Sequence, residues 1–184
     1  MAKYFISGDE LFDNAFLLAE KVLSSGFSPN FLVGIWRGGT PVGIAVQEYL
    51  ALNGVKTDHI AIMTRRYDNE KIDQATDTLG VYGLEYLIDR ANSDDSVLLI
   101  DDVYDTGLTI QGVVNELERR SRKNTPKIKV ATIYYKPKRN KTGKVPDYYL
   151  YETDDWLVFP HELNGLTKEE IIKNKSKKIA ALFS

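Results

Sequence analysis

The sequence predicts an α/β fold, an open, mostly parallel, twisted β-sheet flanked by helices. Segments typical of strands and of helices alternate along most of the 184 residues. The apolar runs at 31–36 and 97–100 are typical of strands covered on both faces. Because ligands of such sheets bind beyond the carboxyl ends of the strands, the loops after these two runs are the candidate sites.

The composition is that of a single compact domain, with 43% hydrophobic and 27% charged residues. The absence of cysteine excludes a disulfide scaffold, a cysteine nucleophile and thiolate metal ligands, and favours a reducing compartment. The formal net charge of -2 argues against a generic nucleic-acid binder. The first residues carry no charged leader followed by a long apolar stretch, so we expect a cytoplasmic protein without a membrane partner.

The expected elements follow from caps and apolar spacing. A first helix begins at the capping box of Ser7 and Glu10 and ends before Gly26. Thr40 and Pro41 are the expected cap and first turn of a second helix. Further strands are expected at 59–63, 128–135, 148–151 and 156–159, further helices at 84–91, from about 109 and at 167–183, and a long mobile loop at 64–80.

The first candidate loop carries three carboxylates directly after the 97–100 strand, at Asp101, Asp102 and Asp105. An Asp-Thr-Gly-x-Thr turn at 105–109 then opens a helix, whose free backbone N–H groups and positive dipole end suit a phosphate. The carboxylates ahead of the turn suit sugar hydroxyls or a hydrated magnesium ion. An acidic pair alone is compatible with a plain capped turn, but turn chemistry does not require the whole run 101–109.

The second candidate loop is Trp36-Arg37-Gly38-Gly39-Thr40, at another strand-to-helix junction. Its arginine lies beside two glycines, which let backbone amides approach an anion. Two anion sites predict a ligand with phosphate at both ends, although Arg-Gly-Gly by itself is also explained by a tight turn.

The run Val97 to Thr109, VLLIDDVYDTGLT, closely resembles the phosphoribosyl pyrophosphate (PRPP) motif of the type I phosphoribosyltransferases. Residues 36–39 resemble that family's pyrophosphate loop. Residues 134–137 and 154–160 resemble base-binding segments of the purine branch, above all its xanthine-guanine/hypoxanthine group. The resemblance covers about residues 4–162 and implies one domain with a core over about 27–140, a flexible loop over about 64–80 and a small C-terminal base-binding hood over about 145–165. The C-terminal helix expected at about 167–183 lies outside the resemblance.

The resemblance implies a purine salvage enzyme that transfers the phosphoribosyl group from PRPP to a 6-oxopurine with magnesium and releases pyrophosphate. It also implies a homodimer or homotetramer. By resemblance, the residues that bind the 5′-phosphate are Asp105, Thr106, Gly107, Leu108 and Thr109, and those that bind the ribose are Asp101 and Asp102. Pyrophosphate would be bound by Arg37, Gly38 and Gly39, and the purine by Lys136, Trp156 and Leu157. Magnesium would be held by Asp102 and Glu162.

The resemblance also implies how some of these residues act. Asp105 would be the general acid/base on a purine ring nitrogen, and Lys136 would donate to the exocyclic oxygen, which selects against adenine. Trp156 would stack on the purine, while Glu162 stands where the family commonly has aspartate, which leaves its role open. A cis peptide bond is expected at Arg37–Gly38.

Simpler readings stand beside these assignments. Asp105 would serve only as a helix cap, Lys136 as a solvated lysine, and Trp156 as a core residue. Arg65 and Arg66 would either reach pyrophosphate from a closing flap or lie on the surface.

Three other functions remain open. One is a PRPP-sensing regulator that binds RNA or DNA through the basic run 136–144 and the lysine-rich final helix, which a salt titration of binding would detect. Another is an orotate or other non-purine transferase, disfavoured by Lys136 and Trp156. The last is a signalling receiver, which would leave 105–109 and 37–39 unused.

Overall fold

The computed structural model describes residues 3–67 and 78–183. The chain divides into two compact units, a larger one over 14–154 and a smaller one made of both ends, 1–13 and 155–184. The expected hood of about 145–165 is divided between the units, because residues 148–152 pair with the main sheet.

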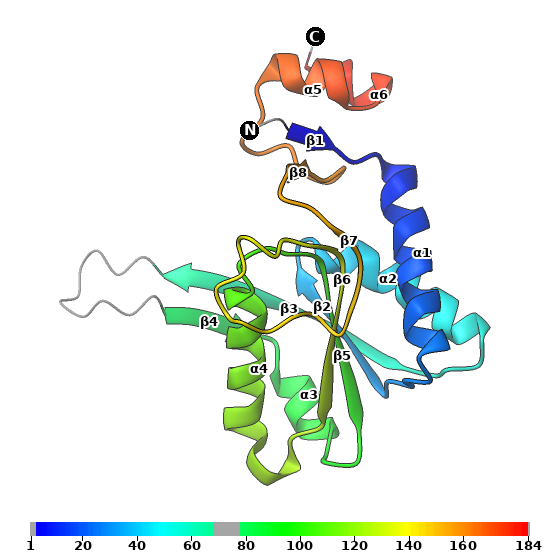
Figure 1. Cartoon of the computed structure of the whole chain (residues 1–184), viewed down its shortest axis with the longest axis vertical. Helices are drawn as coiled ribbons and strands as arrows, with labels where there is room; N and C mark the ends of the chain where they lie inside the picture. Colours follow the sequence, from blue (N-terminus) through cyan, green and yellow to red (C-terminus); the bar gives the residue numbers. More distant parts are fainter. Residues whose placement is uncertain (1–2, 68–77, 184) are drawn as a thin grey trace, which may run out of the picture. The chain divides into compact units, whose positions relative to one another are not determined.

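The larger unit is built on a six-stranded sheet in the order β4-β3-β2-β5-β6-β7 (Figure 1). Its strands are β2 (Phe31–Trp36), β3 (Asp58–Tyr67), β4 (Thr78–Tyr82), β5 (Ser96–Tyr104), β6 (Lys127–Tyr135) and β7 (Tyr148–Glu152). All neighbouring strands are parallel except β3 and β4, which are antiparallel. The prediction of an open, mostly parallel sheet is therefore confirmed.

Helices cover both faces of this sheet. They are α1 (Gly8–Ser24), α2 (Gly39–Leu52), α3 (Glu85–Arg90) and α4 (Leu108–Ser121), which a short 3-10 turn (Arg122–Asn124) follows. In the larger unit, α1 and α2 lie on one face and α3 and α4 on the other (Figure 1). None of the described helices is long and apolar enough to cross a membrane.

Burial on both faces explains the apolar runs of the central strands. Val33 of β2 and Leu99 of β5 pack in one cluster with Leu87 of α3 and with Val113 and Leu117 of α4. The alternate residues of the same strands are also buried, so neither strand shows the polar alternation of a half-exposed sheet.

Two strands are longer than the sequence predicted. β5 continues past Ile100 to Tyr104, because Asp101, Val103 and Tyr104 pair with β6. β3 continues to Tyr67 and pairs with β4, so 64–67 and 78–80 are strand rather than loop. This pairing is a tertiary contact that the local sequence does not specify, although Val81 of β4 packs against the core. The rest of the expected loop, 68–77, lies outside the described residues.

The smaller unit pairs the two ends of the chain. β1 (Lys3–Phe5) lies parallel to β8 (Trp156–Val158), and α5 (Lys168–Asn174) and α6 (Lys177–Ala180) follow, where one helix was predicted. The predicted capping box of Thr167 and Glu170 is confirmed at the start of α5. Glu170 also accepts from Lys3 at 2.6 Å, which ties α5 to β1.

Candidate functional site

The two candidate loops meet at one edge of the sheet, because β2 and β5 are parallel neighbours with Gly34 beside Ile100. A Cβ atom at Gly39 would overlap the backbone carbonyl of Ile100, and one at Gly38 would overlap the carboxylate of Asp102. Only glycine at both positions lets the first loop approach the second this closely. The acidic pair and the glycine pair therefore form one continuous surface.

The glycine loop connects β2 to α2. Gly38 is the N-cap of α2, so the positive end of this helix and its free N–H groups lie at the loop. The expected cap Thr40 lies instead in the first turn, where its buried Oγ1 has no hydrogen-bond partner in the described structure. The Arg37 side chain is exposed. The expected cis peptide is one residue off: it joins Trp36 to Arg37, not Arg37 to Gly38.

The acidic pair lies at the end of the buried part of β5. The Asp102 side chain is only 7% exposed, and its backbone N–H donates to Asp101 Oδ1 at 3.0 Å. Burial raises the pKa of the Asp101 carboxyl to about 7, against the opposing effect of N–H groups of Asp102 and Gly39 that donate to it. The pair thus holds a proton or attracts a cation near neutral pH.

The donor set of this pair fits magnesium. Mg²⁺ prefers carboxylate oxygens, keeps several waters and takes its remaining ligands from substrate phosphates, so one or two carboxylates suffice. Asp101 and Asp102 supply these oxygens beside the glycine loop. Within the described ranges, no group of three or more His, Cys, Asp or Glu residues forms a complete protein cage for a metal.

The turn at 105–109, predicted to bind phosphate and called the phosphate loop below, leads from β5 into α4. Gly107 is the N-cap of α4 with a φ of 76°, a left-handed conformation that strains other residues. The Tyr104 ring closes this turn, since a Cβ atom at Gly107 would overlap it. The backbone N–H of Leu108 donates to Thr106 Oγ1 at 3.4 Å, and the first turn of a helix leaves N–H groups free to bind a phosphate.

Asp105 does not cap this helix, because the cap is Gly107 and no described side chain caps it. Its carboxylate is instead paired with two cations from the loop after β6. Lys136 Nζ lies 3.5 Å from Oδ2, and Arg139 Nε donates to Oδ1. Lys136 is therefore not a solvated lysine, and its residue is only 6% exposed. Arg139 was not among the predicted site residues, since nothing in a basic loop marks which cation reaches a carboxylate 34 residues away.

The hood residues belong to the smaller unit and are described within it. Trp156 is 58% exposed, which excludes the core reading for its side chain in that unit. Leu157 is buried and lies beside Tyr4 in the β1–β8 pair. The Glu162 carboxylate accepts from the backbone N–H of Phe159 at 3.0 Å, so it closes the turn after β8. The described structure gives Glu162 this local role and leaves its predicted metal role untested.

The paired arginines lie at the end of β3. Arg65 is exposed on the strand opposite Gly80 of β4. The side chain of Arg66 is outside the described structure. Neither is placed at the glycine loop by a described contact, so their predicted contact with pyrophosphate is untested.

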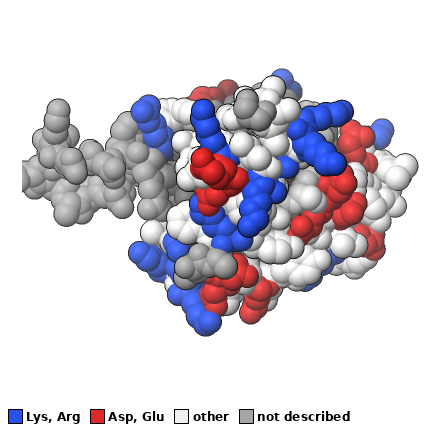
Figure 2. Space-filling view, turned by 90° about the horizontal axis from the view of Figure 1, so that it is seen from above, with Lys and Arg blue, Asp and Glu red and all other residues white. Residues whose placement is uncertain are grey.

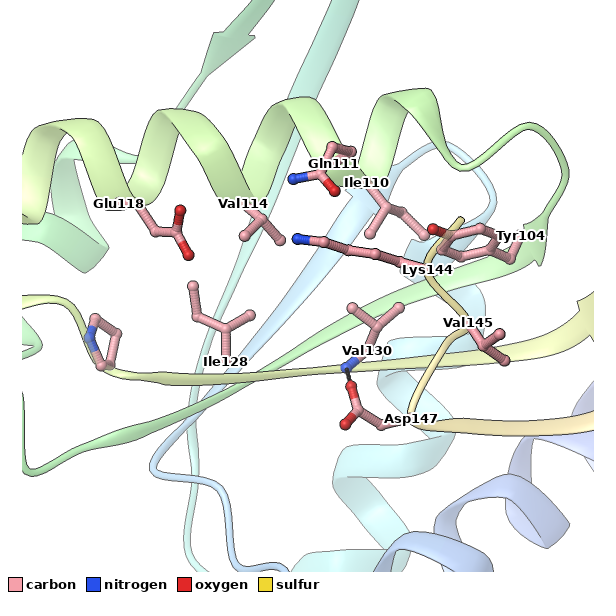
Figure 3. Close-up of a pocket in the computed structure, with 11 residues that line it drawn as sticks. Tyr104, Ile110, Gln111, Val114, Glu118, Ile128, Val130, Lys144, Val145 and Asp147 are labelled. Atoms are coloured by element: carbon pink, nitrogen blue, oxygen red, sulfur yellow. Dashed lines mark hydrogen bonds between the residues drawn. The ribbon is translucent and has the colours of Figure 1, made fainter. Parts of the chain in front are cut away.

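A cavity of about 250 Å³ lies between α4 and β6 (Figure 3). Apolar side chains of the two elements face each other across it, namely Ile110, Val114, Ile128 and Val130. The Lys144 side chain extends over them, and Asp147 is anchored by the N–H of Val130 at 2.8 Å (Figure 3). Tyr104 also lines this cavity and contacts the phosphate loop through its ring, but no predicted site residue lies in the lining.

Charges of both signs are interspersed on the face shown in Figure 2. Three of the five basic residues in 136–144 pair with carboxylates: Lys136 and Arg139 with Asp105, and Lys138 with Asp154. Nucleic acid requires a basic surface with free cations. These pairings therefore give the regulator hypothesis no support.

Comparison with known proteins agrees with this arrangement. A family model described as a phosphoribosyl transferase domain matches residues 4–164. A purine phosphoribosyltransferase from Pyrococcus horikoshii has 28% sequence identity and a TM-score of 0.67, over 91% of this chain and 99% of that one. No curated protein matches the chain significantly.

Two further solved structures share the fold. A hypothetical protein from Neisseria gonorrhoeae, with bound ppGpp, has 20% identity and a TM-score of 0.73, over 100% of this chain and 99% of that one. Xanthine-guanine-hypoxanthine phosphoribosyltransferase from Helicobacter pylori has 19% identity and a TM-score of 0.68, over 89% and 96%. At these identities the likeness concerns the fold alone.

Proposed function

Because the chain belongs to the phosphoribosyltransferase family, we propose that it transfers the 5-phosphoribosyl group from PRPP to a 6-oxopurine, namely hypoxanthine, guanine or xanthine. The products are the nucleoside 5′-monophosphate and pyrophosphate. The observation that carries the proposal is the close approach of Gly38 and Gly39 to Asp102 and Ile100, which sets two anion-binding loops around one acidic pair. PRPP has this pattern, with a phosphate at one end, a pyrophosphate at the other and ribose hydroxyls between them.

In this proposal the two helix N-termini hold the two anions of PRPP. Residues 105–109, which lead into the first turn of α4, bind the 5′-phosphate through backbone N–H groups. Gly38 and Gly39, with the exposed Arg37, bind pyrophosphate at the start of α2. The carboxylates of Asp101 and Asp102 accept hydrogen bonds from the ribose hydroxyls.

Asp102, with Asp101 beside it, would hold magnesium, which when bound would neutralise charge on the departing pyrophosphate. Asp102 is buried and lies next to the glycine loop. Glu162, which closes a turn in the smaller unit, is proposed as a further metal-site residue on the family pattern alone.

The base meets two groups of the larger unit. Asp105 takes the proton from a purine ring nitrogen as the bond from C1′ to pyrophosphate breaks and the bond from C1′ to the base forms. Lys136 donates a hydrogen bond to the exocyclic oxygen of the base. The exocyclic amino group of adenine cannot accept this hydrogen bond, so adenine is rejected. Trp156 and Leu157 are proposed as purine-binding residues on the family pattern alone.

The names of two relatives support the substrate class. The 28% identical Pyrococcus horikoshii protein is named a purine phosphoribosyltransferase, and the Helicobacter pylori enzyme is named for xanthine, guanine and hypoxanthine. On the same family pattern we propose a cytoplasmic homodimer or homotetramer, which light scattering of the purified protein tests.

The test of the function is a turnover panel with PRPP and magnesium against hypoxanthine, guanine, xanthine, adenine and orotate. Pyrophosphate and nucleotide are measured together, with a chelator as the control for magnesium. We expect turnover of one or more 6-oxopurines, none of adenine or orotate, and loss of turnover on chelation. Nucleotide formation from orotate or adenine alone, or from no base at all, contradicts the proposal.

A further inference from the structure

Asp105 has both carboxylate oxygens occupied by cations in this structure. Arg139 Nε donates to Oδ1, and Lys136 Nζ lies 3.5 Å from Oδ2. Each carboxylate oxygen has two acceptor sites, so an incoming N–H group does not have to displace both cations. At Oδ1, however, it competes with the guanidinium of Arg139 for the same atom.

The two cations differ in how readily they can leave. The Lys136 side chain is 8% exposed and its backbone N–H donates to the Tyr104 carbonyl at 2.9 Å, so it is held at the end of β5. The Arg139 side chain is 51% exposed. An exposed ion pair contributes little to stability, because solvent replaces the partner at small cost. Arg139 is therefore the cation that moves.

The loop that carries Arg139 does not depend on this side chain for its place. Its two ends are tied to the phosphate loop by backbone hydrogen bonds, from the N–H of Lys136 to Tyr104 and from the N–H of Lys141 to Thr106, both at 2.9 Å. Tyr104 Oη adds a contact at 2.8 Å with Thr142 Oγ1. Because these contacts hold the loop without the guanidinium, a purely structural reading leaves the contact with Asp105 unexplained.

We infer that Arg139 is a positioning residue that occupies Asp105 while no base is bound and is displaced by the purine. This inference rests on the proposed function. The exchange replaces one N–H donor by another: the guanidinium N–H leaves Oδ1, and the ring N–H of the purine takes its place. Lys136 stays near Oδ2 and is within reach of the exocyclic oxygen of the base.

The exchange has a consequence when PRPP is bound alone. With Arg139 on Oδ1, a water molecule competes with the guanidinium for this oxygen of Asp105. Attack by water would break the bond from C1′ to pyrophosphate, form a bond from C1′ to the water oxygen, and yield ribose 5-phosphate and pyrophosphate. Arg139 thus suppresses the loss of PRPP to hydrolysis until a base arrives.

The experiment compares Arg139→Gln with Lys141→Gln, a matched control that removes one exposed cation from the same loop without a described contact to Asp105. We expect Arg139→Gln to lower the KM for hypoxanthine by up to about five-fold, the factor that an exposed ion pair contributes. Its kcat stays nearly unchanged, and pyrophosphate release from PRPP without base increases. Arg139→Lys restores part of the wild-type KM, and Lys141→Gln behaves as wild type.

A second measurement separates this inference from the proposed function. Calorimetry gives the Kd for hypoxanthine, the free base whose ring N–H must displace Arg139, and needs no turnover. Tighter binding by Arg139→Gln, even in a protein without transferase activity, supports the displacement. Unchanged or weaker binding by Arg139→Gln, an equal effect of Lys141→Gln, or no binding by the wild-type protein overturns it.

Discussion

The junction from β2 to α2 and the junction from β5 to α4 both lead into the N-terminus of a helix, but their glycines are required for different reasons. Gly107 is needed for its own backbone conformation, a φ of 76° at the N-cap of α4. Gly38 and Gly39 are needed because the other junction lies against them. The first requirement is local and the second arises only when the two strands are neighbours.

The difference explains how specific each motif is in the sequence. A backbone conformation such as that of Gly107 depends on the residues on both sides of the glycine, so the run from Asp101 to Thr109 is distinctive in the sequence. A steric requirement from a distant segment selects glycine and nothing beside it, so Arg-Gly-Gly is a weak signal. The chemistry is divided in the same way, since the β5 junction carries the carboxylates and the β2 junction carries backbone donors.

The largest expected effect tests this division of chemistry. Asp105→Asn lowers kcat about 10²–10⁴-fold, because the amide cannot take the proton of the base. Binding of PRPP persists, since the backbone N–H groups of α4 remain. Rates with hypoxanthine and calorimetry with PRPP measure the two effects. Asp147→Asn is the control, and wild-type turnover in Asp105→Asn rules out the role assigned to this residue.

A stability test addresses the contact between the junctions. Gly39→Ala lowers the free energy of unfolding by about 1–3 kcal/mol or more, because its Cβ atom overlaps the Ile100 carbonyl. In a chain of this length that lowers Tm by roughly 2–4 °C per kcal/mol, measured by thermal unfolding. Gly8→Ala, with nothing within 4 Å of the added Cβ atom, leaves Tm nearly unchanged. Equal Tm values for both variants contradict the crowding of Gly39.

Comparing Gly107 of the β5 junction with Gly143 separates two costs of a substitution by alanine, the strained backbone conformation and the steric overlap of the added Cβ atom. Gly107 and Gly143 have φ values of 76° and 68°, so alanine at either position costs about 1–2 kcal/mol. Only Gly107 also has the Tyr104 ring in the way, whereas nothing lies within 4 Å at Gly143. Chemical denaturation should show a larger loss for Gly107→Ala than for Gly143→Ala. The reverse order excludes a role of Tyr104 in closing the turn.

The smallest expected effect concerns Thr40 in the β2 junction. Its buried Oγ1 has no partner in the described structure, as is also true of Thr57 Oγ1 at the opposite edge of the sheet. Replacing either threonine by valine changes the free energy of unfolding by within about 1 kcal/mol, because no hydrogen bond is lost. Only Thr40→Val raises the KM for PRPP, since its hydroxyl lies at the proposed pyrophosphate site. A normal KM in Thr40→Val, or a raised one in Thr57→Val, removes Thr40 from the site.

Much of the fold and part of the site could be predicted because their causes are local. Apolar runs, capping boxes and the turn at 105–109 depend on neighbouring residues, and the parallel sheet follows from their alternation. The extension of β5 to Tyr104 could not be read in this way, because it depends on pairing with β6. The same holds for the pairing of β3 with β4, which is a tertiary contact that no short stretch of sequence specifies.

The site shows the same limit more sharply. Asp105 and Lys136 were predicted one by one, but their proximity, and the second cation Arg139, come from loops that follow adjacent strands. The pairing of β1 with β8 was also not predicted, since these strands come from opposite ends of the chain.

The sequence alone determined the types of chemistry present: a phosphate turn, an acidic pair, a glycine loop and the family to which they belong. These are set by bond geometry, backbone conformation and hydrogen bonding within a few residues. The tertiary structure decided which groups act on each other, the glycines against Asp102 and the cations on Asp105. Such contacts depend on strand order and on the space left between packed loops, which no short stretch of sequence specifies.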